Sequence, residues 1–281
     1  MEANQPCGSF KLRGMQVACK DAIENGATKF LASSGGNARL AVAYVGYNWN
    51  IPTTVVLPDT TPENVIDELK RMNAEVRIEG HVWDEANEYC LDLCEKDPGY
   101  AYIPPFDHPK LWEGHSTIVD DLVWQCPEKP DAIVLSVGGG GMMNGVVEGL
   151  VRNGWEDVEI VAVETEGAAS LNAAIAAGKP VSIDGLTSIA KSLGAQCVAE
   201  KAFENTQQYS IVSHLVNDET SCRACVRFAD EHRVLVEPAC GASLSVVYDN
   251  NDVLEKYRNI VVIVCGGSKV DLDQITEWRK L

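Results

Sequence analysis

The chain has 281 residues, a formal net charge of -18 at pH 7 and 23% charged residues. This length allows one large or two medium domains, and two are taken as the starting expectation. The excess of acidic side chains repels phosphate backbones and anionic lipid headgroups, and no basic patch offsets it, so neither a nucleic acid nor a membrane is an expected partner.

The ten cysteines raise the question of disulfide bonds. A secreted, disulfide-bonded protein needs a signal peptide, whereas the polar start from Met1 to Pro6 has no apolar segment. The longest apolar runs, such as Ile260 to Cys265, are too short to span a bilayer. We therefore expect a soluble protein in the reducing cytoplasm. Cys222 and Cys225 form a CxxC pair without further ligands for zinc, and we expect them to be buried core residues.

Short β-rich runs alternate along the chain with longer segments of helical period, which is typical of parallel sheets covered by helices. The expected helices include one from Glu63 to Asn73, with Thr61 as its N-cap, and one from Glu85 to Lys96. The expected strands, most of them apolar on both faces, are Lys29 to Ala32, Thr53 to Leu57, Glu75 to Glu79, Ala132 to Val137, Glu159 to Glu164 and Ile260 to Cys265. The pattern predicts an α/β protein.

Turn-forming residues crowd the stretch from Asp97 to Pro109 and interrupt the alternation of strands and helices. We interpret this stretch as a crossing between domains, with the boundary near residue 106. A smaller α/β domain then covers residues 9–106, and a larger one joins residues 1–8 with 107–281.

Lys11 stands in the segment Gly8-Ser9-Phe10-Lys11, near the start of the chain. A lone lysine is usually solvated, so this segment by itself is a weak signal. Beside a phosphate-binding loop, however, a lysine amine can form an imine with an aldehyde cofactor, which then stabilises a carbanion at a substrate Cα. Lys11 is therefore a candidate catalytic residue if the chain contains such a loop.

The segment Ser34-Gly35-Gly36-Asn37-Ala38 follows an expected strand and opens an expected helix through Leu40 to Tyr47. Its amides and the Ser34 hydroxyl offer donors to a substrate carboxylate, and the Asn37 amide can bond a phenolic oxygen. Either Ser34 or Asn37 also fits a simple helix N-cap. The sequence leaves both interpretations open.

Four consecutive glycines, Gly138 to Gly141, lie between an expected strand and a helical segment that begins near Met142. Glycines let consecutive amides approach an anion, and a helix N-terminus adds a favourable dipole. The dinucleotide fingerprint fails because Met143 or Asn144 stands where its last glycine is needed, and the Lys-Ser/Thr ending of a P-loop is absent. We predict a phosphate-binding loop, with a plain tight turn as the alternative.

Taken together, these segments give the chain a resemblance to the fold-type II pyridoxal-phosphate (PLP) enzymes, and within them to the serine dehydratase and serine dehydratase-like proteins of animals. The motifs that carry it are Gly8-Ser9-Phe10-Lys11, Ser34-Gly35-Gly36-Asn37-Ala38, Trp112-Glu113-Gly114-His115, Gly138 to Gly141, Val236 to Ala242 and Val262 to Ser268. The resemblance implies a tryptophan synthase β-like fold with two twisted, mainly parallel sheets. It also implies a homodimeric lyase that dehydrates and deaminates L-serine or L-threonine to a 2-oxo acid.

The resemblance further implies roles for single residues. Lys11 would be the Schiff-base lysine and the base for the α-proton, Asn37 would meet the ring hydroxyl, and Cys265 would face the pyridine nitrogen. Without the resemblance, Cys265 would be taken for a buried strand cysteine. Phe10 and Ser192 would contact the two faces of the pyridine ring. The residues that would contact the cofactor phosphate are Gly138, Gly139, Gly140, Gly141 and Met142. Those that would contact the substrate are Ser34, Gly35, Gly36, Asn37 and Ala38.

A neutral thiol at Cys265 is a weak donor and does not hold a protonated pyridine as a carboxylate does. Prompt loss of the β-hydroxyl is then favoured over racemisation. The alternatives are β-replacement or racemisation on the same scaffold, or a weakly active PLP-binding regulatory protein.

Glu164 ends an expected strand after the glycine loop. The resemblance implies that it surrounds a monovalent cation such as K⁺, together with backbone carbonyls at Gly138, Ala168, Leu193 and Ala195. A surface or helix-capping glutamate is the alternative. His115 has no identifiable partner in the sequence and is expected to be structural.

Arg39 stands where the animal relatives generally have glycine, and the relatives carry roughly thirty more residues before the lysine motif. A guanidinium at this place points to solvent or reaches an anionic substrate. Because Arg39 lies two residues beyond Asn37, helix geometry turns it about 200° around the axis. We therefore expect Arg39 to face solvent and to matter little for serine binding.

Overall fold

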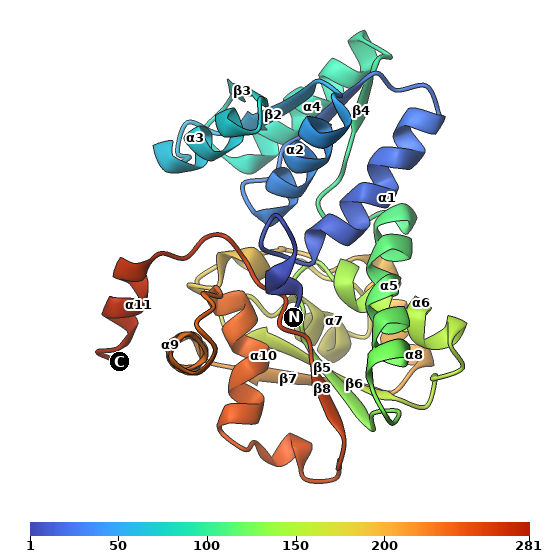
Figure 1. The fold of residues 1–281 in the computed structure, drawn as a ribbon, viewed down its shortest axis with the longest axis vertical. Helices are drawn as coiled ribbons and strands as arrows, with labels where there is room; N and C mark the ends of the chain where they lie inside the picture. The colour runs from blue at the N-terminus through green and yellow to red at the C-terminus, as the bar shows by residue number, and fades with distance from the viewer. The chain divides into compact units, whose positions relative to one another are not determined.

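The computed structural model describes residues 1–281, which divide into two compact units (Figure 1). The smaller unit is Lys11–Gly114, and the larger joins Met1–Phe10 with His115–Leu281. The second division lies inside helix α5 (Pro109–Gln125), a few residues beyond the boundary expected near residue 106. The assignment of residues 9–106 and of 1–8 with 107–281 to functional domains stays a prediction.

The smaller unit is built on a parallel four-stranded sheet with the strand order β3-β2-β1-β4. Its strands are β1 (Lys29–Ala32), β2 (Thr53–Leu57), β3 (Glu75–Ile78) and β4 (Tyr100–Tyr102), and its helices are α1 (Lys11–Glu24), α2 (Asn37–Trp49), α3 (Glu63–Arg71) and α4 (Trp83–Lys96). Strands β1 and β2 have the predicted bounds, and β3 ends one residue earlier, at Ile78 instead of Glu79. Strand β4 was missed because its three residues lie in the turn-rich stretch.

Strand β2 shows why this sheet needs helices on both faces. Its alternate residues Val55 and Leu57 pack with α2 and α3 in one cluster, whereas Val56 packs with α4 in another. Burying each of these side chains stabilises the fold by roughly 1.5–3 kcal/mol. Edge strand β3 instead leaves Glu75 and Ile78 exposed, so its faces are not both covered as expected.

The larger unit contains a second parallel sheet with the order β7-β6-β5-β8. Its strands are β5 (Ala132–Ser136), β6 (Glu159–Thr165), β7 (Ile211–Val216) and β8 (Ile260–Val262), and its further helices are α6 (Gly141–Arg152), α7 (Ser170–Ala177), α8 (Glu200–Gln208), α9 (Asp218–His232), α10 (Pro238–Tyr248) and α11 (Leu272–Trp278), with 3-10 turns η1 (Glu2–Asn4), η2 (Lys191–Leu193) and η3 (Asp252–Leu254). Strand β8 is shorter than predicted, and β7 was missed because Ser213 and His214 interrupt its apolar pattern.

Residues 1–10 belong to the larger unit because their backbone pairs with the segment after β8 (Figure 1). The amide of Phe10 donates to the Cys265 carbonyl oxygen at 3.2 Å, and the amide of Gly267 donates to the Gly8 carbonyl oxygen at 2.8 Å. Gly266 has a left-handed φ of 84°, and a Cβ there would lie 2.2 Å from the Gly8 carbonyl oxygen. Only glycine allows this approach.

The predicted cap of one helix and the predicted start of another differ from the structure. Helix α3 has Pro62 at its N-cap and no side-chain cap, so the assignment of Thr61 as the cap was wrong. Helix α4 begins at Trp83 instead of Glu85, because Glu85 is the residue whose carboxylate reaches back to the amides of His81 and Val82 at 2.5 and 3.4 Å.

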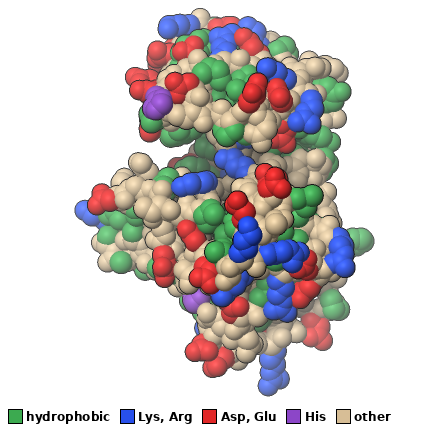
Figure 2. Space-filling model, turned by 90° about the vertical axis from the view of Figure 1, so that its left-hand side faces the viewer, with side chains coloured by type: hydrophobic (Ala, Val, Ile, Leu, Met, Phe, Trp, Pro, Cys, Tyr) green, Lys and Arg blue, Asp and Glu red, His purple; other side chains and the backbone are tan.

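The surface mixes charges of both signs. Acidic and basic side chains are interspersed on the face that Figure 2 shows, and ion pairs such as Lys129–Asp157 at 2.5 Å lie in the solvent. Each exposed pair contributes less than about 1 kcal/mol. No helix of the chain has the length and apolar character that a membrane span needs.

Candidate active site

Lys11 is the first residue of α1 and directly follows Phe10, whose amide bonds to Cys265. The preceding residue, Ser9, forms an antiparallel bridge with Gly266. At the other end of the side chain, Lys11 Nζ donates to the Pro105 carbonyl oxygen at 2.5 Å. The lysine is therefore held both through the backbone before it and at its amine.

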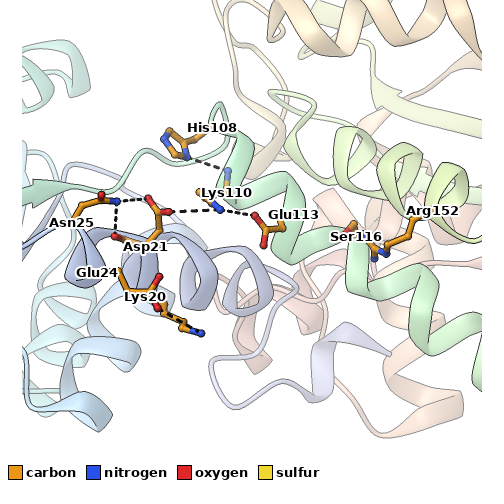
Figure 3. Close-up of polar contacts among 9 residues, drawn as sticks. All are labelled: Lys20, Asp21, Glu24, Asn25, His108, Lys110, Glu113, Ser116 and Arg152. Carbon is orange, nitrogen blue, oxygen red and sulfur yellow. Dashed lines mark hydrogen bonds and ion pairs between the residues drawn. The ribbon is translucent and has the colours of Figure 1, made fainter.

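Helix α1 is tied to the first turns of α5. A Cβ on Gly114 would lie 2.3 Å from the Arg13 carbonyl oxygen and 2.6 Å from Gly14 Cα, so only glycine lets the two backbones approach. Further along, Lys110 Nζ lies 3.6 Å from Asp21 Oδ1 and 2.9 Å from Glu113 Oε2 (Figure 3). Because these ion pairs are partly exposed, the close approach at Gly114 is the stronger constraint on the helix that carries Lys11.

The predicted substrate loop, Ser34 to Ala38, leads from the end of β1 into α2. The N-cap of α2 is Gly36, which rules out the interpretation of Ser34 or Asn37 as that cap. Ser34 Oγ accepts the Gly36 amide at 3.1 Å, which leaves the hydroxyl hydrogen able to donate elsewhere. The loop therefore presents a hydroxyl and a helix N-terminus at one place.

Arg39 contradicts the sequence prediction, because its side chain is 0% exposed instead of facing solvent. Its Nη1 donates to the Gly36 carbonyl oxygen at 2.9 Å. The prediction considered only the angular position of Cβ. A long helical side chain also points back toward the N-terminus of its helix, which brings the guanidinium to the loop.

The glycine loop is packed too closely for side chains. A Cβ on Gly138 would lie 3.0 Å from Leu193 Cα, and one on Gly140 would lie 2.4 Å from the Ala202 Cβ. Gly140 is also the left-handed N-cap of α6, with a φ of 90°, and the Gly139 carbonyl accepts the Ala199 amide at 3.1 Å. The loop is thus one rigid turn backed by η2 and by the start of α8.

The same loop fits a phosphate group. No acceptor within the chain takes the amide hydrogens of Gly139, Gly140 and Gly141, although the surrounding backbone is largely buried. Buried amides need a partner, and these lie at the N-terminus of the 12-residue helix α6. Met142 is the second residue of α6 and is buried. A bound anion would satisfy these donors.

The two residues expected on the pyridine ring have different surroundings. Ser192 is exposed in η2, where its carbonyl oxygen would lie 3.2 Å from a Cβ on Gly138, so it borders the glycine loop. Phe10 packs its ring on His115, with centroids 4.9 Å apart. His115 is fully buried, and its expected structural role is now specific: it supports Phe10.

Cys265 lies after β8 and is 6% exposed. Hydrogen bonding with Cys240, followed by burial, raises the pKa of the Cys265 thiol well above its ordinary value. Glu237 also raises that pKa, and its carboxyl carbon would lie 2.1 Å from a Cβ on Gly267. Cys265 is therefore a neutral thiol. Sequence reasoning did not single out Cys240 and Glu237, although both lie in a motif that carried the resemblance.

The two cysteines of the CxxC sequence have a structural role. Cys222 and Cys225 are buried in α9, as expected, where a Cβ on Gly241 of α10 would lie 2.6 Å from Cys225 Sγ. All ten cysteines are free thiols.

Glu164 is fully buried, and its two carboxylate oxygens accept the amides of Leu171 and Asn172 at 2.8 Å each. It therefore caps α7, which was one of the two alternatives. Burial raises the pKa of Glu164 to about 7 in spite of these donors. Among the predicted carbonyl ligands, Leu193 accepts the Ala195 amide at 2.8 Å, and Ala168 forms a bridge with Thr165. No group of three or more His, Cys, Asp or Glu side chains could hold a metal ion.

Comparisons with known proteins agree with this geometry. A family model of pyridoxal-phosphate dependent enzymes matches residues 1–266. The chain is 45% identical to human L-serine dehydratase/L-threonine deaminase, covering 100% of this chain and 88% of that protein, and 42% identical to the mouse serine dehydratase-like protein, covering 98% and 86%. The structure of a fungal L-serine ammonia-lyase from Rhizomucor miehei matches with a TM-score of 0.93 at 34% identity, covering 100% of this chain and 91% of that one. The chain belongs to the fold-type II family of pyridoxal-phosphate-dependent enzymes, among the relatives of the serine and threonine dehydratases.

Proposed function

We propose that the protein is a PLP-dependent lyase that converts L-serine or L-threonine into a 2-oxo acid and ammonia by β-elimination. The observation that carries this proposal is the 45% identity, over the whole chain, with a protein named L-serine dehydratase/L-threonine deaminase. The packed glycine loop and the neutral thiol at Cys265 support it from the structure.

The proposal assigns each cofactor contact to residues of the chain. The amides of Gly138 to Gly141 and Met142 would hold the phosphate, Asn37 the ring hydroxyl, and Phe10 and Ser192 the faces of the ring. PLP, when bound, supplies an electron sink for negative charge that develops at the substrate Cα. The chain provides the groups that orient the cofactor and move protons.

Lys11 Nζ is the proposed point of covalent attachment and the base that moves the substrate α-proton. An amine is effective in both roles only if its position is restricted. The Pro105 carbonyl at 2.5 Å restricts the Lys11 amine, and the bond between the Phe10 amide and Cys265 restricts the backbone just before it.

Cys265 would face the ring nitrogen and favour elimination. A neutral thiol does not keep that nitrogen protonated as a carboxylate would. Negative charge at Cα then has a shorter lifetime, so departure of the β-hydroxyl is favoured over reprotonation on the opposite face. Racemisation and β-replacement are the competing outcomes.

The substrate carboxylate would bind at Ser34 to Ala38. The Ser34 hydroxyl hydrogen and the N-terminal amides of α2 are the donors, and the helix dipole adds attraction. Serine and threonine both fit this scheme because they differ by one methyl group.

Three further parts of the proposal rest on the resemblance. A monovalent cation such as K⁺ would lie at Glu164 with the carbonyls of Gly138, Ala168, Leu193 and Ala195. The protein would be a homodimer, and it would act in the cytoplasm. Sedimentation velocity tests the dimer, and the dependence of activity on K⁺ against a bulky organic cation tests the ion.

The decisive experiment loads the purified protein with PLP and adds L-serine or L-threonine. We expect equal amounts of 2-oxo acid and ammonia. A thiol nucleophile added in parallel detects β-replacement, and chiral analysis of the remaining serine detects racemisation. Cofactor binding without any 2-oxo acid contradicts the proposed lyase and leaves the weakly active regulatory protein.

A further inference from the structure

We propose that Arg39 is a positioning residue that orients the loop from Ser34 to Ala38 for carboxylate binding. The inference rests on the proposed function, which places the substrate carboxylate at this loop. It concerns a residue that the sequence analysis placed in solvent and that the structure buries.

Gly36 is held from both sides. Its amide donates to Ser34 Oγ at 3.1 Å, and its carbonyl oxygen accepts from Arg39 Nη1 at 2.9 Å. Gly36 is an extended N-cap, with φ of -123° and ψ of -156°, and glycine has no side chain to keep that conformation in place. The two side chains supply the restraint that the glycine lacks.

The planar peptide bond between Gly36 and Asn37 relates the direction of the Asn37 amide to that of the Gly36 carbonyl. The chain has no cis peptide bonds, so the carbonyl of Gly36 and the amide of Asn37 point in opposite directions across one plane. When Arg39 holds the carbonyl on its own side, the Asn37 amide is aimed at the other side. That amide is the first donor of α2, which makes it part of the anion-binding end of the helix.

The charge of Arg39 also affects this helix end. Arginine stays protonated, and a cation in the first turn of a helix opposes the macrodipole, which costs stability. The first turn of α2 contains no acidic residue, and Arg39 is 0% exposed, so solvent does not screen its charge. A carboxylate bound at the same helix end is attracted by the helix dipole and by this charge. The arrangement thus makes the loop selective for ligands that carry a carboxylate.

The test compares Arg39→Met with the wild type, using the full PLP-loaded chain. We expect KM for L-serine to rise about tenfold or more, because a charge-assisted restraint is lost, while kcat changes by less than about threefold. Affinities for L-alanine and L-alaninamide, followed by cofactor absorbance, separate the carboxylate from the rest of the ligand. Arg39→Met should weaken L-alanine binding and leave L-alaninamide binding unchanged.

Two further variants control for folding. Arg77→Met removes another arginine of the smaller unit, one that bonds Glu75 and Tyr89, and should leave KM and both affinities unchanged. Arg39→Lys keeps the charge with a single amine and should restore part of the carboxylate preference. If Arg39→Met does not fold, as judged by thermal melting, Arg39→Lys and Arg39→Gln carry the same comparison.

The outcomes separate this inference from the proposed function. An unchanged KM and L-alanine affinity in Arg39→Met, or an equal loss for alanine and alaninamide, overturns the role of Arg39. A wild type that yields no 2-oxo acid overturns the proposed function, and the alanine and alaninamide titrations still test Arg39 because they need no turnover.

Discussion

The helix N-termini of α6 and α2, each proposed to bind an anion, are built in different ways. At α6 the backbone alone makes the turn, with Gly140 in a left-handed conformation and no room for a Cβ beside Ala202. At α2 the glycine is extended, and the side chains of Ser34 and Arg39 hold it. The turn from Gly138 to Gly141, made by the backbone alone and called the backbone cradle below, suits a cofactor that is used in every reaction cycle. A loop held by side chains can change its ligand preference when one of those side chains is substituted.

A third helix N-terminus sharpens this comparison. The amides of Leu171 and Asn172 in α7 are occupied by the carboxylate of Glu164, which belongs to the chain itself. A helix end that has its own anion needs no ligand. The amides of Gly139 to Gly141 have no such partner, and this difference is the structural reason to assign a ligand to α6.

The largest expected effect is that of Lys11→Ala. The variants at the two anion sites are compared with this loss of turnover. Removing the amine should lower turnover on the order of 10³-fold or more, because covalent attachment and proton transfer both fail. The absorbance band of the lysine-bound cofactor should disappear while circular dichroism stays that of the wild type. Wild-type absorbance in this variant contradicts the assignment of Lys11.

The next effect is that of Gly140→Ala on the backbone cradle. The new Cβ would lie 2.4 Å from the Ala202 Cβ at a φ of 90°, so we expect PLP affinity to fall tenfold or more, equivalent to about 1.4 kcal/mol or above. Gly154→Ala is the matched control, since Gly154 has a φ of 68° but nothing within 4 Å of its Cβ. Equal PLP affinities in the two variants, measured by equilibrium dialysis, would contradict the assignment of the glycine loop to the cofactor phosphate.

Ser34→Ala probes the side-chain-held loop. It removes the proposed hydroxyl donor and the acceptor of the Gly36 amide, so KM for L-serine should rise about tenfold. PLP affinity should change less than twofold, in contrast with Gly140→Ala. If the two variants impair cofactor and substrate binding alike, the distinction between the two helix ends does not hold.

The last variant, Glu164→Gln, is expected to change stability. Because burial raises the folded pKa to about 7, the folded protein binds more protons than the unfolded chain between the unfolded pKa and about pH 7. The contribution of Glu164 is therefore fully present below its unfolded pKa and is lost as pH rises through 7. The difference in unfolding free energy between wild type and variant should change by about 2 kcal/mol between pH 5 and pH 7.5.

Urea unfolding at several pH values measures this difference, and a constant difference contradicts the raised pKa. Repeating the series with K⁺ tests the proposed cation. Above pH 7, K⁺ should stabilise the wild type more than Glu164→Gln if the ion lies beside that carboxylate.

Much of the fold could be predicted because local pattern and tertiary environment agree. Strands β1 and β2 match their predicted bounds, since continuous apolar runs suit a sheet that is covered on both faces. Strand β4 could not be predicted, because Tyr100 to Tyr102 acquire strand geometry only by pairing with β1. Strand β8 is shorter than its apolar run predicts, because the carbonyl oxygens of Val264 and Cys265 accept amides of the N-terminal segment.

The candidate site divides in the same way. Glycine spacing and residue type by themselves predicted that Gly138 to Gly141 bind a phosphate and excluded a dinucleotide site, because backbone freedom is a local property of glycine. The sequence also provided the candidates Lys11, Asn37 and Cys265 through motifs. Only the tertiary structure decided that Arg39 is buried against Gly36, that Phe10 lies on His115 and that Cys265 has Cys240 beside it. Burial and partner choice depend on which distant segments pack together, and no local pattern of residues encodes that.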